Sequence, residues 1–337
     1  MRRSGGGTRR GLALVALLAA LTGVVAACTN PPGTGGAPAT TTLVPLPGAP
    51  GEFSLLSYNV AGLPQEFSKE NPGLHMPLIS QRLNAYDVVL TQENFDWWQP
   101  VAGLLDFANY FGRLRQDVTH PYRSGQHPGP FAVGVDPSQR PLLVGDGLGM
   151  LARYPFTEPV RVPWTDCFGG IVGPGAADCL AMKGFSMATM TLADGRTVDV
   201  YDLHGEAGSD PQDQVLQAAD YRQLAAFVNA RSAGHAVVLA GDTNLHTDGT
   251  ATTPEGAGDA EIWQEFLAAT GLTDTCVELA CPFGSSIDKA AYRDGGGVDL
   301  TVLSQAYPQA DFLGPQGEDL SDHLPLALRF AWDDARP

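Results

Sequence analysis

Apolar runs of five to nine residues recur along the chain from Phe53 onward, and stretches with a helical period separate them. The runs are FSLLSYN, DVVLT, GLGMLA, GFSMATMTL, TVDVYDL, HAVVLA, VDLTVL and LPLALRF (residues 53–59, 87–91, 147–152, 184–192, 197–203, 235–240, 298–303 and 324–330). Several are apolar at successive rather than alternate positions, as in strands that are buried on both faces. The pattern predicts sheets covered on both sides.

The clearest helical pattern covers residues 211–232. Ser209 or Asp210 can cap this helix, and Pro211 suits its first turn. Its apolar stripe consists of Ala218, Tyr221, Leu224, Ala225 and Val228. A second helix is predicted from Asp259 to Thr270, ending at Gly271.

Weaker helical patterns cover residues 75–85 and 97–109. Neither an internal repeat nor a second linker interrupts residues 51–333. These residues are therefore expected to form one α/β domain in which helices cover packed strands.

The first 27 residues have a different pattern, with arginines followed by an uncharged apolar run from Leu12 to Ala27. Because the run is shorter than the roughly 20 residues of a membrane-spanning helix, it predicts a cleaved export signal. The segment Val25-Ala26-Ala27-Cys28 resembles the lipobox of bacterial lipoproteins, in which the cysteine is lipidated. Residues 28–50 are rich in Pro, Gly and Thr and predict a tether. We expect an exported protein, anchored to the cell surface through Cys28.

The cysteines agree with export. Besides Cys28 there are Cys167, Cys179, Cys276 and Cys281, an even set that suits an oxidising compartment. Their close spacings favour Cys167–Cys179 and Cys276–Cys281 disulfides, although four cysteines permit three pairings. A zinc site is the alternative, and the absence of a nearby histidine disfavours it.

Composition and charge narrow the class of partner. The chain has 337 residues, of which 44% are hydrophobic, which suits a large folded core. Removing residues 1–27, with four arginines and no acidic residue, takes the formal charge from −17 to −21. This charge disfavours tight nonspecific binding of nucleic acid. The alternative explanation for the negative charge is that some of the acidic residues surround a divalent cation.

In the segment VVLAGDTNLH (residues 237–246), an apolar run ends at Gly241, and Asp242 and Asn244 follow it. If the extended geometry persists, these two side chains project to the same side. The alternative is a turn in which both satisfy their own backbone. The polar residues Asn59, Glu93, His204, Asp322 and His323 also lie at the ends of predicted strands. Together these positions predict a site, because loops at strand ends commonly carry functional groups.

The motifs SYNVAG, TQEN, GLGMLARYP, DLHGEAG, GDTNLH and LSDHLP occur in that order. Their set resembles the endonuclease/exonuclease/phosphatase superfamily over most of residues 53–330. The resemblance implies a DNase I-like four-layer α/β sandwich, in which two packed mixed sheets are flanked by helices. It also implies a divalent-metal site at one edge of the sandwich and hydrolysis of a phosphoester by metal-assisted attack of water.

The resemblance also implies roles for individual residues. Glu93, with Asn59 and Asp322 near it, would hold Mg²⁺, with Mn²⁺ or Ca²⁺ as alternatives. His204 and His323 would donate hydrogen bonds or a proton to the phosphate. Asp242 would orient or deprotonate the attacking water, and Asn244 with Asn59 would bind phosphate.

The family has an aspartate that orients the last histidine, and two positions in this chain qualify. Asp288 lies in SSIDKAAYR and Asp299 in GGVDLTVL. We assign the role to Asp288, because its context is closer to the motif and leaves the three glycines as a hairpin turn.

Three details favour the sphingomyelinase or phospholipase C-like branch. They are the segment Gln92-Glu93-Asn94-Phe95-Asp96, the pair Lys183-Gly184, and an acidic enzyme tethered near lipid head groups. Lys183 could instead be an exposed lysine at the start of a strand, and Trp97 and Trp98 are expected in the core and at its rim. The alternatives are a secreted nuclease, which would need a basic groove, and a noncatalytic lipoprotein that binds a ligand. A monomer is expected.

Overall fold

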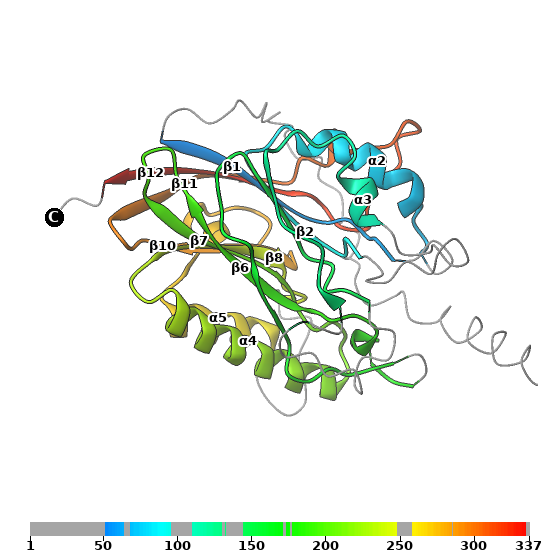
Figure 1. The fold of residues 1–337 in the computed structure, drawn as a ribbon. Coiled ribbons are helices and arrows are strands. Elements are labelled where there is room, and N and C mark those ends of the chain that lie inside the picture. The colour runs from blue at the N-terminus through cyan, green and yellow to red at the C-terminus, as the bar shows by residue number, and fades with distance from the viewer. Residues whose placement is uncertain are drawn as a thin grey trace, which may run out of the picture.

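The computed structural model describes residues 51–334 except 64–67, 96–109, 130–131, 133–143, 171–172, 176, 248–257 and 285. Two six-stranded mixed sheets pack face to face, and helices cover the outer face of each (Figure 1). The predicted four-layer α/β sandwich is confirmed. The predicted export signal, the tether with Cys28, the helix at 97–109 and Trp97 and Trp98 lie outside the described residues.

The first sheet has the strand order β11-β12-β1-β2-β4-β3. The bounds are β11 Val298–Ala306, β12 Leu326–Asp334, β1 Glu52–Asn59, β2 Val88–Gln92, β4 Gly149–Ala152 and β3 Tyr122–Arg123. β1 runs parallel to β2 and antiparallel to β12. Helices α2 (Pro72–Leu83) and α3 (Tyr110–Leu114) cover the outer face of this sheet.

The second sheet has the order β5-β6-β7-β8-β10-β9. The bounds are β5 Val160–Pro163, β6 Gly184–Thr191, β7 Thr197–His204, β8 Ala236–Asp242, β10 Asp288–Arg293 and β9 Thr273–Asp274. β7 and β8 are its parallel pair. Helices α4 (Pro211–Arg231) and α5 (Asp259–Thr270) cover its outer face, and α6 (Thr275–Glu278) follows β9.

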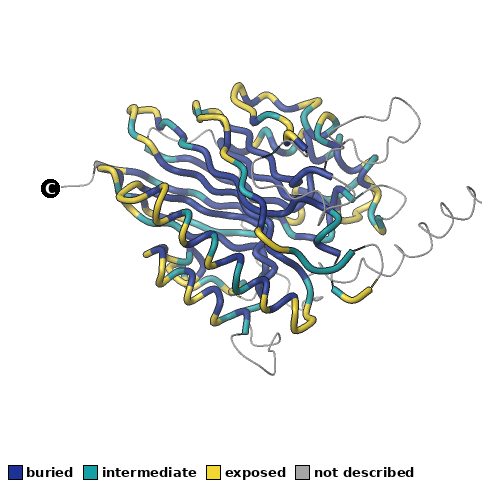
Figure 2. Tube along the Cα trace, turned by 60° about the horizontal axis from the view of Figure 1, so that its bottom comes forward, coloured by how far each residue is buried: buried dark blue, intermediate teal, exposed yellow. Residues whose placement is uncertain are grey.

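The central strands are buried on both faces, as their continuous apolar runs predict (Figure 2). In β1, Leu55 packs between the sheets while Leu56 packs under α2. In α4, Tyr221 and Leu224 pack on the second sheet. Helix α4 follows an N-cap at Asp210, whose backbone amide donates to Asp213 in a capping box.

Both expected disulfides, Cys167–Cys179 and Cys276–Cys281, are present. Among the described residues no helix is both long enough and apolar enough to span a bilayer.

Candidate active site

The parallel strands of both sheets end on the same side of the sandwich. Asn59 is the last residue of β1, and Glu93 follows the end of β2. His204 and Asp242 end β7 and β8 and are register partners. Gly241 permits this close approach, because a Cβ atom there would lie 2.2 Å from the carbonyl oxygen of Leu203.

Asn59 lies at the centre of the polar cluster. Its Nδ2 donates to Glu93 Oε1 at 3.1 Å and to Asp242 Oδ2 at 3.0 Å, and lies 3.3 Å from His323 Nε2. Its Oδ1 accepts a hydrogen bond from the amide of Ala61 at 3.0 Å. The amide nitrogen of Asn59 therefore faces the acids, and Asn59 holds the two carboxylates in place by hydrogen bonds. In this arrangement its amide oxygen does not face a metal ion bound by these acids.

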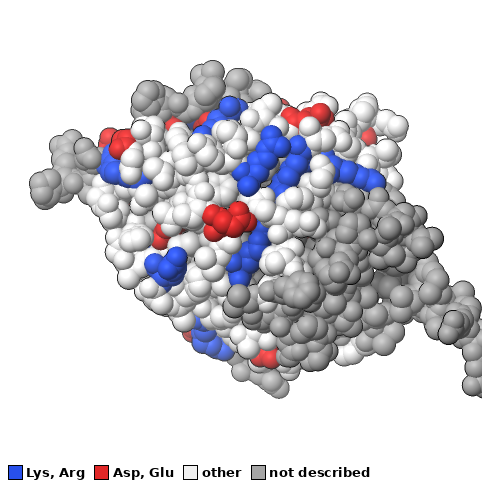
Figure 3. Space-filling view, viewed as in Figure 1, with Lys and Arg blue, Asp and Glu red and all other residues white. Residues whose placement is uncertain are grey.

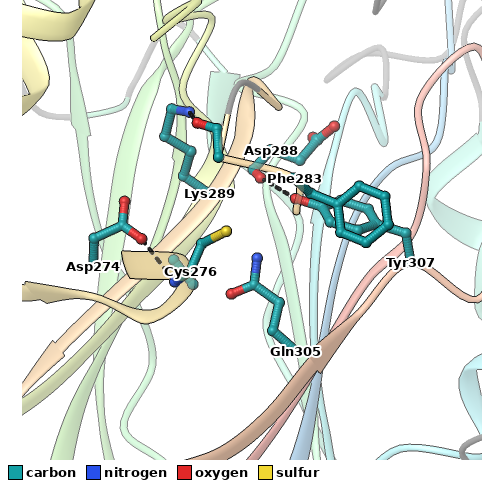
Figure 4. Close-up of a pocket in the computed structure, with 9 residues that line it drawn as sticks. Asp274, Cys276, Phe283, Asp288, Lys289, Gln305 and Tyr307 are labelled. Atoms are coloured by element: carbon teal, nitrogen blue, oxygen red, sulfur yellow. Dashed lines mark hydrogen bonds between the residues drawn. The ribbon is translucent and has the colours of Figure 1, made fainter. Parts of the chain in front are cut away.

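Asp288 orients His323. The carboxylate Oδ2 of Asp288 lies 3.0 Å from Nδ1 of His323, which leaves Nε2 directed at Asp242 Oδ2, 3.6 Å away. Tyr307 donates to the backbone carbonyl of Asp288 at 2.9 Å from the neighbouring pocket (Figure 4). Asp299, the alternative candidate, lies on β11 opposite Asp333. The geometry therefore favours Asp288.

The two histidines have opposite electrostatic surroundings. Burial lowers the pKa of His323, but Asp288 and Asp242 outweigh it and hold that pKa well above its usual range. Burial, together with the positive charges of Lys183 and His323, holds the pKa of His204 well below its usual range. The surroundings therefore favour the charged form of His323 and the neutral form of His204, an arrangement that suits different roles for the two imidazoles.

The buried acids fit a hard divalent cation. Burial and then Asp322 raise the pKa of Glu93 to about 7, and burial raises the pKa of Asp242 despite the opposing effect of His323. One ligating atom each from Asp242, Asp288 and His323 lies within 4.8 Å of the others. Buried carboxylates at this density call for added positive charge, and oxygen donors are those that Mg²⁺ prefers.

The predicted ligands Glu93 and Asp322 are both outside this compact group, and Asp322 is half-buried. Its negative charge is nevertheless close enough to raise the pKa of Glu93. Glu93 itself has a φ of 53°, a left-handed backbone that non-glycine residues seldom adopt. Unusual backbone conformations of this kind are concentrated at functional sites, and the carboxylate of Glu93 accepts the hydrogen bond from Asn59.

The expectation that Asn244 and Asp242 project to the same side is wrong. The φ of 51° at Asn244 ends the extended geometry, so Asn244 does not continue the direction of Asp242. Its backbone amide donates to Asp242 Oδ1 at 3.0 Å, which is the turn that the sequence left as the alternative. Its Nδ2 donates one N–H to the carbonyl of Gly205 at 3.1 Å. The predicted phosphate contact of Asn244 would therefore use the second N–H of the same amide.

Lys183 is buried, so the alternative of an exposed lysine at the start of a strand does not hold. Its ammonium forms an ion pair with Asp178 and lies 3.4 Å from the carbonyl oxygen of Gly205, next to His204. Its charge reaches the site, since it lowers the pKa of both Glu93 and His204.

Three further side chains fix the backbone around the site. Trp164 Nε1 donates to the carbonyl of His204 at 2.9 Å, and Ser321 Oγ donates to that of Asn59 at 2.7 Å. Gln217 Nε2 on α4 donates to the carbonyl oxygens of Glu206 at 2.8 Å and of Asn244 at 3.3 Å. The sequence contained no local signal for these contacts.

Comparison with protein families shows to which family the chain belongs. The model of the endonuclease/exonuclease/phosphatase family matches residues 56–323, which is most of the chain. The chain belongs to this family. Among curated members, a sphingomyelinase of Mycobacterium tuberculosis is 30% identical over 298 residues, covering 83% of this chain and 53% of that protein. The chain thus spans about half the length of the curated relatives it matches, and the resemblance to the sphingomyelinase branch is confirmed.

Solved structures of two other proteins share this fold. Beta toxin from Staphylococcus aureus, in a structure with bound magnesium ions, aligns with a TM-score of 0.52 and 18% identity, covering 82% of this chain and 99% of that one. D. rerio TDP2 complexed with a single-strand DNA product also gives 0.52, at 16% identity, covering 83% and 98%. The fold alone therefore does not choose the substrate.

Proposed function

We propose that this chain hydrolyses a phosphodiester with the help of magnesium, and that the substrate is a choline-type phospholipid. The observation that carries the hydrolase proposal is the convergence of strand ends from both sheets on one buried cluster. Its members are Asn59, Glu93, His204, Asp242, Asp288 and His323.

Each side chain has a role that its surroundings support. Magnesium, when bound by Glu93 and the neighbouring acids, supplies positive charge to the phosphoryl oxygens. Asp242 accepts a proton from the attacking water, and its raised pKa makes it a stronger base than an exposed carboxylate. His323, charged and held by Asp288, donates to the phosphate. Neutral His204 lies 3.4 Å from Asp242 Oδ2 and makes no ring-nitrogen hydrogen bond within the described chain, so its ring nitrogens keep their hydrogen-bonding capacity for a phosphate oxygen.

The preference for lipid is supported by the sphingomyelinase relatives and by charge. On the face drawn in Figure 3, Lys and Arg side chains form short groups separated by acidic and uncharged residues. A nuclease binds a polyanionic backbone and favours a continuous basic groove. The formal charge of −17 likewise repels polyanions.

A substrate panel tests the proposal. Wild type and His204→Ala are assayed with magnesium on sphingomyelin, lysophosphatidylcholine and supercoiled plasmid. We expect release of phosphocholine from lipid, intact plasmid, and a loss of about 10²-fold or more in the variant. Rapid plasmid nicking beside inert lipid would identify a nuclease. Zero turnover with Mg²⁺, Mn²⁺ and Ca²⁺ would instead identify a binding protein.

We also propose that the enzyme acts outside the cytoplasm, anchored through a lipid on Cys28. The charged start, apolar run and lipobox-like segment support this placement. In a bacterial host that processes lipoproteins, wild type should fractionate with membranes, and Cys28→Ala should appear in the soluble exported fraction. Equal membrane association of both would contradict lipid anchoring.

A further inference from the structure

A second group of buried acids lies outside the proposed catalytic cluster. Asp178 belongs to a 3-10 helix (Asp178–Leu180), Glu206 to the loop after β7, and Asp213 to the first turn of α4. One ligating atom from each lies within 4.8 Å of the others. The three residues are 2%, 0% and 1% exposed.

This group gathers several buried negative charges. Lys183 forms an ion pair with Asp178, which accounts for one carboxylate. Asp220, also buried, adds a further negative charge. A further cation would offset the cost of burying these carboxylates.

An unsatisfied oxygen points to what is missing. Glu206 Oε1 accepts a hydrogen bond from the amide of Phe168 at 2.7 Å. Glu206 Oε2, fully buried, has no hydrogen-bond partner among the described residues. A buried carboxylate oxygen without a donor is costly, and its place in a group of acids suits a metal ligand.

We propose that Asp178, Glu206 and Asp213 bind a structural calcium ion. Carboxylate oxygens select a hard cation, and the burial of all three residues leaves little room for the water ligands that Mg²⁺ retains. Ca²⁺ accepts a coordination shell made largely of protein oxygens. The ion would join the loop closed by Cys167–Cys179, the segment that follows His204, and the start of α4.

Calcium binding and thermal unfolding of the full chain test this site. Glu93→Gln first weakens the proposed catalytic metal site, so that the remaining calcium signal reports on the second one. Chelator-treated Glu93→Gln is titrated with CaCl₂ by calorimetry and melted with and without calcium. We expect one bound ion per chain and a rise in Tm of about 5 °C at saturating calcium.

Glu206→Gln removes one carboxylate while keeping the shape of the side chain. Added to Glu93→Gln, it should abolish both the binding and the Tm rise, whereas Glu265→Gln on the exposed face of α5 should preserve them. A calcium response of unchanged size in the Glu206→Gln chain would overturn the proposal. If that variant does not fold, absence of calcium binding to Glu93→Gln at millimolar calcium would overturn it as well. Neither outcome depends on turnover, so it is separate from the proposed hydrolase activity.

Discussion

Asp288 Oδ2 lies 3.0 Å from Nδ1 of His323, at the point where β10 meets the loop before β12. Both residues are at most 2% exposed. The contact fixes which nitrogen of His323 faces the site, and the acid stabilises the charged imidazole. Because His323 is 35 residues from Asp288, only the fold brings this pair together.

Replacing Asp288 should therefore disable His323 without displacing it. Asp288→Asn is expected to lower kcat by about 10²-fold or more, since the imidazolium loses its counter-charge. It should also change the pH profile of kcat, because His323 would lose its proton at lower pH. Asp299→Asn is the matched control and should retain wild-type kcat. Activity retained in the Asp288 variant and lost in the Asp299 variant would reverse the assignment.

Gln217 is predicted to position two loops of the site. Gln217→Leu leaves the carbonyls of Glu206 and Asn244 without their shared donor, which should cost about 1–3 kcal/mol in unfolding free energy. We expect kcat to fall about tenfold with a smaller change in KM, because the two loops directly follow His204 and Asp242, which end β7 and β8. Gln212→Leu, on the exposed side of the same helix, should change neither. A Gln217 variant that loses stability but keeps wild-type kcat would show a purely structural role.

Asp202 predicts a pH dependence of stability. It is buried between the sheets, where burial raises its pKa well above the usual range against the opposing hydrogen bond from Gln92 at 2.6 Å. A carboxyl group with a raised folded pKa stabilises the fold below its unfolded pKa of about 3.9. That contribution is lost as pH rises through the folded pKa.

Asp202→Asn cannot ionise, so it should lose less stability than wild type when pH rises from about 4 to about 9. The difference between their unfolding free energies should change by about 1–3 kcal/mol over this range, as measured by urea denaturation. Asp166→Asn, at an exposed position, should follow wild type. A difference that is constant with pH would contradict a raised pKa for Asp202.

The central strands and the main helices were predictable because their signals are local. The runs around Leu55 and Val238 are long and apolar, and α4 carries its cap and stripe within its own sequence. The interior strand β10 was not among the predicted runs, because the sequence DKAAYR of Asp288–Arg293 places charged residues beside alanines. The edge strands β3, β5 and β9 were not predicted either. They have two to four residues and are largely exposed or half-buried, so no apolar run marks them.

The candidate site was predictable as a set of residue types, but its geometry was not. Motif order identified Glu93, His204 and Asp242, whereas the orientation of the Asn59 amide depends on contacts 34 and 183 residues away. The left-handed turn at Asn244 overrode the alternation of an extended strand. The burial of Lys183 followed from a salt bridge that only the folded loop creates.

The most direct test of the account is the rate of p-nitrophenol release from bis(p-nitrophenyl) phosphate as magnesium is added back to chelator-treated enzyme. Wild type should be inactive without the metal and regain activity with it. Glu93→Gln should need far more magnesium and remain about 10²-fold slower, while Glu265→Gln should match wild type. Turnover that is independent of magnesium, or unchanged by loss of the Glu93 carboxylate, would contradict the claim that these strand ends form a metal-assisted phosphodiesterase site.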